Sequence, residues 1–118
     1  MELGGYDGIT YSNTKGIEDT FKFKGVLIEA SDAFVAMDLN RPNTQNFRAA
    51  ISTKAEVEFC SGSNPTCGTF NNLKQNARHN KELWAVRPPY TLPGKHISTI
   101  LKQSKLQYID LFFIDVEG

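Results

Sequence analysis

The chain has 118 residues, which is enough for one domain with a single hydrophobic core. Its thirteen basic and thirteen acidic residues balance, so no basic excess favours binding to DNA, RNA or an acidic membrane surface. No apolar run approaches the roughly 18 to 20 residues of a transmembrane helix, and the start "MELGG" does not have the pattern of a signal peptide.

Apolar runs predict the strands. Residues 24–30 (KGVLIEA) and 110–115 (DLFFID) are rich in aliphatic and aromatic residues, and both are expected to be buried strands. Residues 46–52 (NFRAAIS) are a weaker third strand, and Met1 to Leu3 form the end of a short first one. Residues 55–60 (AEVEFC) alternate as in a half-exposed strand, whereas 82–92 begin like a strand that Pro88 and Pro89 interrupt.

Four helices are expected between the strands. Residues 12–23 offer Ser12, Asn13 or Thr14 as N-cap, with Ile17 and Phe21 on one face. Residues 31–42 have Ser31 as the expected cap and "NRP" as a stop. Residues 95–106 carry lysines near the end, and residues 69–80 are a shorter candidate. In the helix at 31–42, the predicted apolar face consists of Phe34, Val35 and Leu39. In the helix at 95–106, it consists of Ile97, Ile100 and Leu101.

This alternation of strands and helices predicts an α/β fold with a doubly wound, mostly parallel sheet of strand order 3-2-1-4. Ligands of such folds bind where the parallel strands end. The segments that follow the strands are therefore expected to meet there: Glu2–Gly8, Glu29, Ser52 and Asp115–Gly118.

The stretch "ELGGYDG" carries the first candidate site, which we call the glycine loop (Gly4–Gly8). A dinucleotide fingerprint counted from Gly4 would need glycine where Tyr6 and Ile9 stand, so a nicotinamide-dependent dehydrogenase is disfavoured. The looser pattern favours a ligand without a pyrophosphate, and an ordinary turn is the alternative. Glu29 ends the second strand 21 residues after Gly8, where a carboxylate can accept hydrogen bonds from both ribose hydroxyls.

Five segments in order carry a family resemblance: "ELGGYDGITYSNT", "KGVLIEA", "NRP", "AAIS" and "IDLFFIDVEG". The series closely resembles the FkbM-type family of S-adenosylmethionine-dependent methyltransferases, with a less familiar middle at about 61–95. The resemblance implies a class I, Rossmann-like domain of about seven strands. Four of these match, so residues 1–118 are expected to be a partial domain with a shortened first strand and without the later ones.

The resemblance also implies roles for individual residues. The first motif is expected to hold the methionine and ribose part of S-adenosylmethionine, and it comprises Glu2, Gly4, Gly5, Tyr6, Asp7 and Gly8. Glu29 and Ala30 are expected at the ribose, Ala50, Ile51 and Ser52 beside the adenine, and Asp115 at the amino group. Asp115 and Glu117 are the candidate catalytic bases, and a role in orienting the substrate is equally open for Glu117.

The function expected from this resemblance is O-methylation of a small molecule or sugar. The alternative is a non-catalytic methyltransferase-fold module with a binding or trafficking role. No metal site is expected, because Cys60, Cys67 and the two histidines do not have ligand spacing. The cysteines are expected to be free thiols, with a disulfide as the alternative. The fourth strand would lie at an apolar, unprotected sheet edge, and such an edge invites association.

Overall fold

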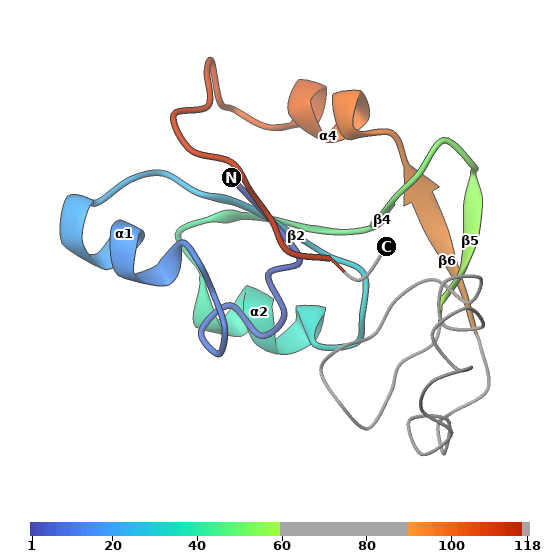
Figure 1. Ribbon diagram of the computed structural model, residues 1–118, viewed down its shortest axis with the longest axis horizontal. Helices are drawn as coiled ribbons and strands as arrows, with labels where there is room; N and C mark the ends of the chain where they lie inside the picture. The colour runs from blue at the N-terminus through green and yellow to red at the C-terminus, as the bar shows by residue number, and fades with distance from the viewer. Residues whose placement is uncertain (60–89, 117–118) are drawn as a thin grey trace.

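The computed structural model describes residues 1–59 and 90–116, and it contains two sheets (Figure 1). The elements, in chain order, are β1 (Glu2–Leu3), α1 (Lys15–Phe21), β2 (Val26–Glu29), α2 (Phe34–Asn40), β3 (Gln45–Arg48), β4 (Ala50–Ile51), β5 (Glu56–Phe59), β6 (Tyr90–Lys95), α4 (Ile97–Gln103) and β7 (Phe113–Ile114). The expected helix at 69–80, the residues 82–89, both cysteines, Glu117 and Gly118 lie outside the described residues.

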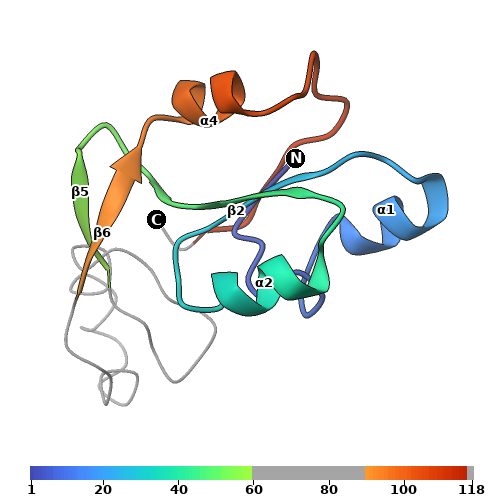
Figure 2. The same cartoon turned by 180° about the vertical axis from the view of Figure 1, so that it is seen from behind.

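The larger sheet has the order β3-β2-β1-β7, and all its pairings are parallel. Helices α1 and α2 lie on one side of it, and α4 lies on the other (Figures 1 and 2). The predicted α/β fold and the predicted strand order are thus confirmed. Because parallel strands end at the same edge, the segments after β1, β2 and β7 meet there; we call this the carboxyl edge, and the opposite one the amino edge.

Strand β2 forms the centre of the core, as its apolar sequence predicts. Val26 and Ile28 belong to the cluster that includes Ile100 of α4, and all three are fully or almost fully buried. Side chains alternate along a strand, so Leu27 points to the other side. There both Leu27 and Met37 of α2 lie close to Gly5. Both faces of the strand are therefore covered, which explains why it contains no polar residue before Glu29.

The predicted third strand, 46–52, is divided between the two sheets. The backbone amide of Ala49 donates to the carbonyl of Glu29, which is the last link to β2. Beyond it, β4 pairs in parallel with β6, and β6 pairs antiparallel with β5. Strand β5 alternates between exposed and buried residues, as predicted.

The predicted apolar face of α2 is wrong. Val35 is exposed and Leu39 is 77% exposed, whereas Met37 is completely buried. The helix begins at Phe34 with Ala33 as its N-cap, not at Ser31. A side chain at Gly5 would collide with the Met37 sulfur, so the absence of one opens the space that Met37 fills. That long-range fit, rather than the local pattern, sets the buried face.

Two other apolar segments are also less buried than the sequence predicts. Phe21 of α1 is largely exposed and lies beside Phe23, with 5.8 Å between the ring centres. Strand β7 lies at the sheet edge, as predicted, but it is not a buried strand: Ile114 is 65% exposed, and Leu111 and Phe112 are exposed as well. The reason is that β7 has only β1 as a neighbour among the described strands.

Helix α4 follows its prediction more closely. His96 caps it by accepting a hydrogen bond from the Ser98 amide, Ile100 is buried, and Lys102 lies in the last turn. Leu101, predicted to share the apolar face, is partly exposed. Among the described residues, none of the helices has the length and apolar character needed to cross a membrane.

Candidate functional site at the carboxyl edge

The glycine loop folds from the end of β1 over the end of β2. The backbone amides of Gly4 and Gly5 both donate to the carbonyl oxygen of Ile28, at 2.9 and 3.2 Å. The next amide, that of Tyr6, donates to the Glu29 carboxylate at 2.7 Å. The loop and the acid that the sequence separates by more than twenty residues are therefore in direct contact.

Two glycines are required by the close packing around the loop. Gly4 has φ +88°, and a Cβ there would lie 1.9 Å from the carbonyl oxygen of Asp115. Gly8 has φ +81°, and its Cβ would lie 2.7 Å from Cγ of Arg41. Only glycine adopts these conformations without strain and leaves this space free. Gly4 thus allows β7 to approach the loop, and Gly8 allows Arg41 to pass beneath it.

Glu29 accepts hydrogen bonds at both carboxylate oxygens, one from the glycine loop and one from the segment after β2. Oε2 accepts from the Tyr6 amide and Oε1 from the Ser31 amide, each at 2.7 Å. The residue is 8% exposed. A carboxylate has about four acceptor positions, so these two bonds leave capacity for further donors. Ala30, which is also predicted to lie at the ribose, stands between Glu29 and Ser31 in the chain and is partly buried.

Glu2 lies underneath the loop and is completely buried, at 0% exposure. Its carboxylate accepts three hydrogen bonds: from the Ser12 hydroxyl at 2.9 Å, the Asn13 amide at 2.7 Å and the Thr14 hydroxyl at 2.6 Å. These three residues are the ones from which the sequence predicts the helix cap, and Thr14 is the N-cap of α1. Glu2 therefore fixes the start of α1 beneath the glycine loop.

Arg41 has a larger role than the sequence predicts, since the pattern "NRP" indicates only a helix stop. It is 1% exposed, and all five guanidinium N–H groups find acceptors. Nε and one terminal nitrogen bind the Glu18 carboxylate; the other donors reach the Gly8 carbonyl and two hydroxyls. Its position before Pro42 indicates the end of a helix. That local pattern does not predict hydrogen-bond partners that are 23 to 33 residues away in the sequence.

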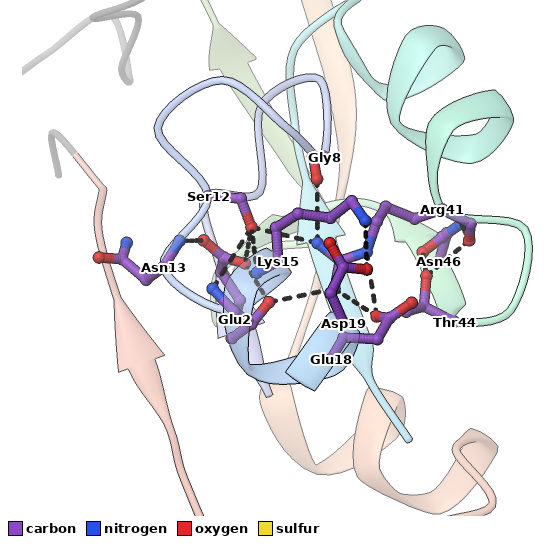
Figure 3. A network of polar contacts seen from close by, with 11 residues as sticks. Glu2, Gly8, Ser12, Asn13, Lys15, Glu18, Asp19, Arg41, Thr44 and Asn46 are labelled. Carbon is purple, nitrogen blue, oxygen red and sulfur yellow. Dashed lines mark hydrogen bonds and ion pairs between the residues drawn. The ribbon is translucent and has the colours of Figure 1, made fainter. Parts of the chain in front are cut away.

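Two hydroxyl groups connect the buried acid to the buried base (Figure 3). The Ser12 oxygen donates to Glu2 and accepts from Arg41 at 3.1 Å. The Thr14 oxygen likewise donates to Glu2 and accepts from Arg41 at 3.3 Å. The two hydroxyls thus link Glu2 to Arg41, whose charge is paired directly with Glu18. We call this set of Glu2, Ser12, Thr14, Glu18 and Arg41 the buried polar network.

Asp115 joins the site from β7. Its backbone amide donates to the Leu3 carbonyl at 2.9 Å, and its carboxylate accepts from the Asn13 side chain at 3.2 Å. The residue itself is exposed. Asp115 therefore lies at the carboxyl edge beside Gly4, with its carboxylate accessible.

The far end of the glycine loop is held by Asp7. Its carboxylate accepts from the Ile9 and Thr10 amides, at 2.9 and 2.7 Å. Partial burial raises the pKa of this carboxyl, but the hydrogen bonds outweigh that effect, and the pKa lies below its usual value. On the other side, Asn40 donates its side-chain amide to the Asp7 carbonyl, so α2 also supports the loop.

Two tyrosines near the loop have unusual backbone conformations. Tyr6 and Tyr11 have φ of 47° and 62°, in the left-handed region that non-glycine residues rarely occupy. Their ring centres are 6.4 Å apart, and Tyr11 is largely exposed. Strain of this kind is concentrated at ligand sites.

Ala50 to Ser52, which are predicted to border the adenine, lie at the smaller sheet, whereas the glycine loop, Glu29 and Asp115 lie at the larger one. Ala50 and Ile51 pair with β6 in the smaller sheet, and the Ser52 amide donates to the Lys95 carbonyl at 3.0 Å. The amide of the preceding residue, Ala49, donates instead to the backbone carbonyl of Glu29. The structure thus joins the glycine loop, Glu29 and Asp115, and places Ala50 to Ser52 at the start of a second sheet.

Comparison of the chain with protein-family models, with curated proteins and with solved structures found no match.

Proposed function

We propose that the carboxyl edge binds S-adenosylmethionine and that the chain carries the cofactor site of a Rossmann-like, FkbM-type methyltransferase acting on an oxygen of a small molecule or sugar. The observation that carries this proposal is the contact of three separate segments at one edge. The Tyr6 amide binds Glu29, and Gly4 lies against Asp115.

The chemistry of the side chains fits this ligand. Two ribose hydroxyls and an amino group are hydrogen-bond donors, and Glu29 and Asp115 are carboxylate acceptors. The cofactor supplies an electrophilic methyl group on a sulfonium, so the protein needs mainly to orient the reactants. In this proposal Glu29 holds the ribose hydroxyls, and Asp115 holds the amino group.

The buried polar network has a positioning role in this proposal. Glu2 is completely buried and its three hydrogen bonds are internal, so it shapes the floor of the site rather than touching the cofactor. Arg41 holds the Gly8 carbonyl from below. Together they keep the loop amides fixed before a ligand arrives.

Proton removal from the acceptor hydroxyl is assigned to a carboxylate of the fourth motif. Asp115 is exposed at the edge, and hydrogen bonding to Asn13 orients its carboxylate. The bound cofactor would supply the methyl group and leave as S-adenosylhomocysteine when its sulfur–methyl bond breaks, and the Asp115 carboxylate would take the proton from the acceptor hydroxyl. Glu117, the second candidate, lies outside the described residues.

Calorimetric titration with S-adenosylmethionine and with S-adenosylhomocysteine tests the proposal. We expect both to bind the chain, and Glu29→Gln to weaken binding at least about tenfold because a hydrogen bond to a charged acceptor is worth about 1.5–3 kcal/mol. Glu58→Gln, an exposed acid on β5, is the matched control and should bind like the parent chain.

The same titration separates the alternatives. Absence of binding by both ligands would overturn the proposal and favour the non-catalytic module. Binding of NAD in their place would favour the dehydrogenase. Binding unaffected by Glu29→Gln would show that the cofactor site lies elsewhere.

A further inference from the structure

A pocket of about 520 Å³ lies at the amino edge, and Thr14, Glu18 and Arg41 of the buried polar network form part of its lining. Its wall includes Met1, just before β1, and Lys24 and Gly25, just before β2. The segment 105–111, which leads into β7, forms another wall. The volume falls within the range of about 300–1,000 Å³ that is typical of small-molecule sites.

Three lysines, Lys22, Lys24 and Lys105, give this pocket an excess of positive charge. Among the described residues, none of the three forms an ion pair, although Lys22 Nζ donates a hydrogen bond to the Asp19 carbonyl at 2.7 Å. The lining also contains two carboxylates, Glu18 and Asp110, and Glu18 is ion-paired with Arg41. The lysines outnumber the remaining carboxylate.

The pocket also has an apolar part. Phe23, Tyr108 and Leu111 line it, and all three are exposed although they are large and mainly apolar. Hydrogen bonding of the Lys105 amide to the Gln45 side chain, at 2.8 Å, ties the surrounding segment to β3. Apolar side chains that lie next to unpaired lysines match a ligand with an apolar portion and an anionic group.

We propose that this amino-edge pocket binds an amphiphile, with its phosphate or carboxylate group on the lysines and its apolar chain against Phe23, Tyr108 and Leu111. The pocket shares Thr14, Glu18 and Arg41 with the buried polar network, but the groups proposed to hold the ligand lie at the amino edge and do not depend on the function proposed for the carboxyl edge. The ligand can be a free amphiphile or a lipid in a bilayer, because both present the same headgroup.

Titration with lysophosphatidate, kept below its critical micelle concentration, provides the test. We expect the chain to bind it, and Lys24→Gln/Lys105→Gln to weaken binding about tenfold, since each surface charge pair contributes up to about 1 kcal/mol. The matched control is Lys54→Gln/Lys95→Gln, which removes the same charge near the smaller sheet and should leave binding unchanged.

Two further probes define the ligand. Inorganic phosphate should bind at least about tenfold more weakly than lysophosphatidate, because burial of each CH₂ contributes about 0.8 kcal/mol. Vesicles of phosphatidylcholine with phosphatidate show whether a bilayer lipid is also accepted. Equal affinity for inorganic phosphate, equal weakening by both double variants, or no binding of lysophosphatidate would each overturn the proposal.

Discussion

The underside of the glycine loop buries charged residues, whereas the β7 edge exposes apolar ones. Beneath the loop, Glu2 and Arg41 are charged and almost inaccessible to solvent. At the β7 edge, Phe112 and Ile114 are apolar and exposed. The difference shows that the position in the sheet outweighs hydropathy. A central strand buries even a carboxylate if hydrogen bonds satisfy it, whereas an edge strand exposes even isoleucine.

Beneath the glycine loop, loss of Arg41 should lower the stability of the fold more than any other change proposed below. Arg41→Ala removes five hydrogen bonds and leaves Glu18 without its buried partner. We expect the free energy of unfolding to fall by about 3–5 kcal/mol, measured by urea denaturation. Arg48→Ala, which breaks the exposed ion pair with Asp32, should cost less than about 1 kcal/mol. Equal costs would show that the buried polar network does not stabilise the fold.

Two glycine substitutions with opposite expected effects on stability test the close packing of the glycine loop. Gly4→Ala places a methyl group against the Asp115 carbonyl at a positive φ, and we expect destabilisation by about 1–3 kcal/mol. Gly16→Ala lies in α1 with no atom within 4 Å of the new Cβ, so it should stabilise by about 0.5–1 kcal/mol. Thermal unfolding compares them, and destabilisation of both to a similar extent would contradict this packing.

The β7 side of the comparison predicts association. An exposed apolar edge strand offers free backbone groups to another chain, so sedimentation should show concentration-dependent self-association. Ile114→Lys should reduce it by placing a charge on the edge. Leu39→Lys is the control, since Leu39 is also apolar and largely exposed but lies on α2. A chain that stays monomeric at all concentrations, or two variants with the same effect, would show that the edge is not adhesive.

The smallest expected effect concerns acid stability at the glycine loop. The Asp7 carboxyl has a lowered pKa in the folded chain, so its contribution to stability is present above its unfolded pKa of about 3.9 and is lost as the pH falls below it. Asp7→Asn keeps an oxygen acceptor for the two amides but does not titrate. Between pH 5 and 3 the parent chain should therefore lose more stability than Asp7→Asn. Parallel pH profiles would contradict this assignment.

The parts of the fold that the sequence predicts are those decided locally. The run 24–30 is apolar at consecutive positions, and it forms the central buried strand. The alternation of 55–60 likewise appears in β5. The order of strands also follows from the alternation of elements, because right-handed crossovers allow few arrangements.

The parts that sequence reasoning missed depend on contacts between distant segments. Met37 is buried because Gly5 leaves room for it, and Arg41 is buried because Gly8 and Glu18 supply acceptors. Neither fact is visible in the local pattern of α2. Similarly, the run 110–115 looks like a core strand, and only its place beside β1 shows that it is exposed.

The central claim is that the carboxyl edge, and not another surface, binds the cofactor. Amide chemical-shift mapping with S-adenosylhomocysteine tests it residue by residue. We predict shifts at the glycine loop, Glu29 and Asp115, with Lys24 and Lys105 at the amino edge unchanged. The claim would be contradicted if saturating ligand left the amide resonances of the glycine loop unchanged, or if it shifted only those of residues at the amino edge.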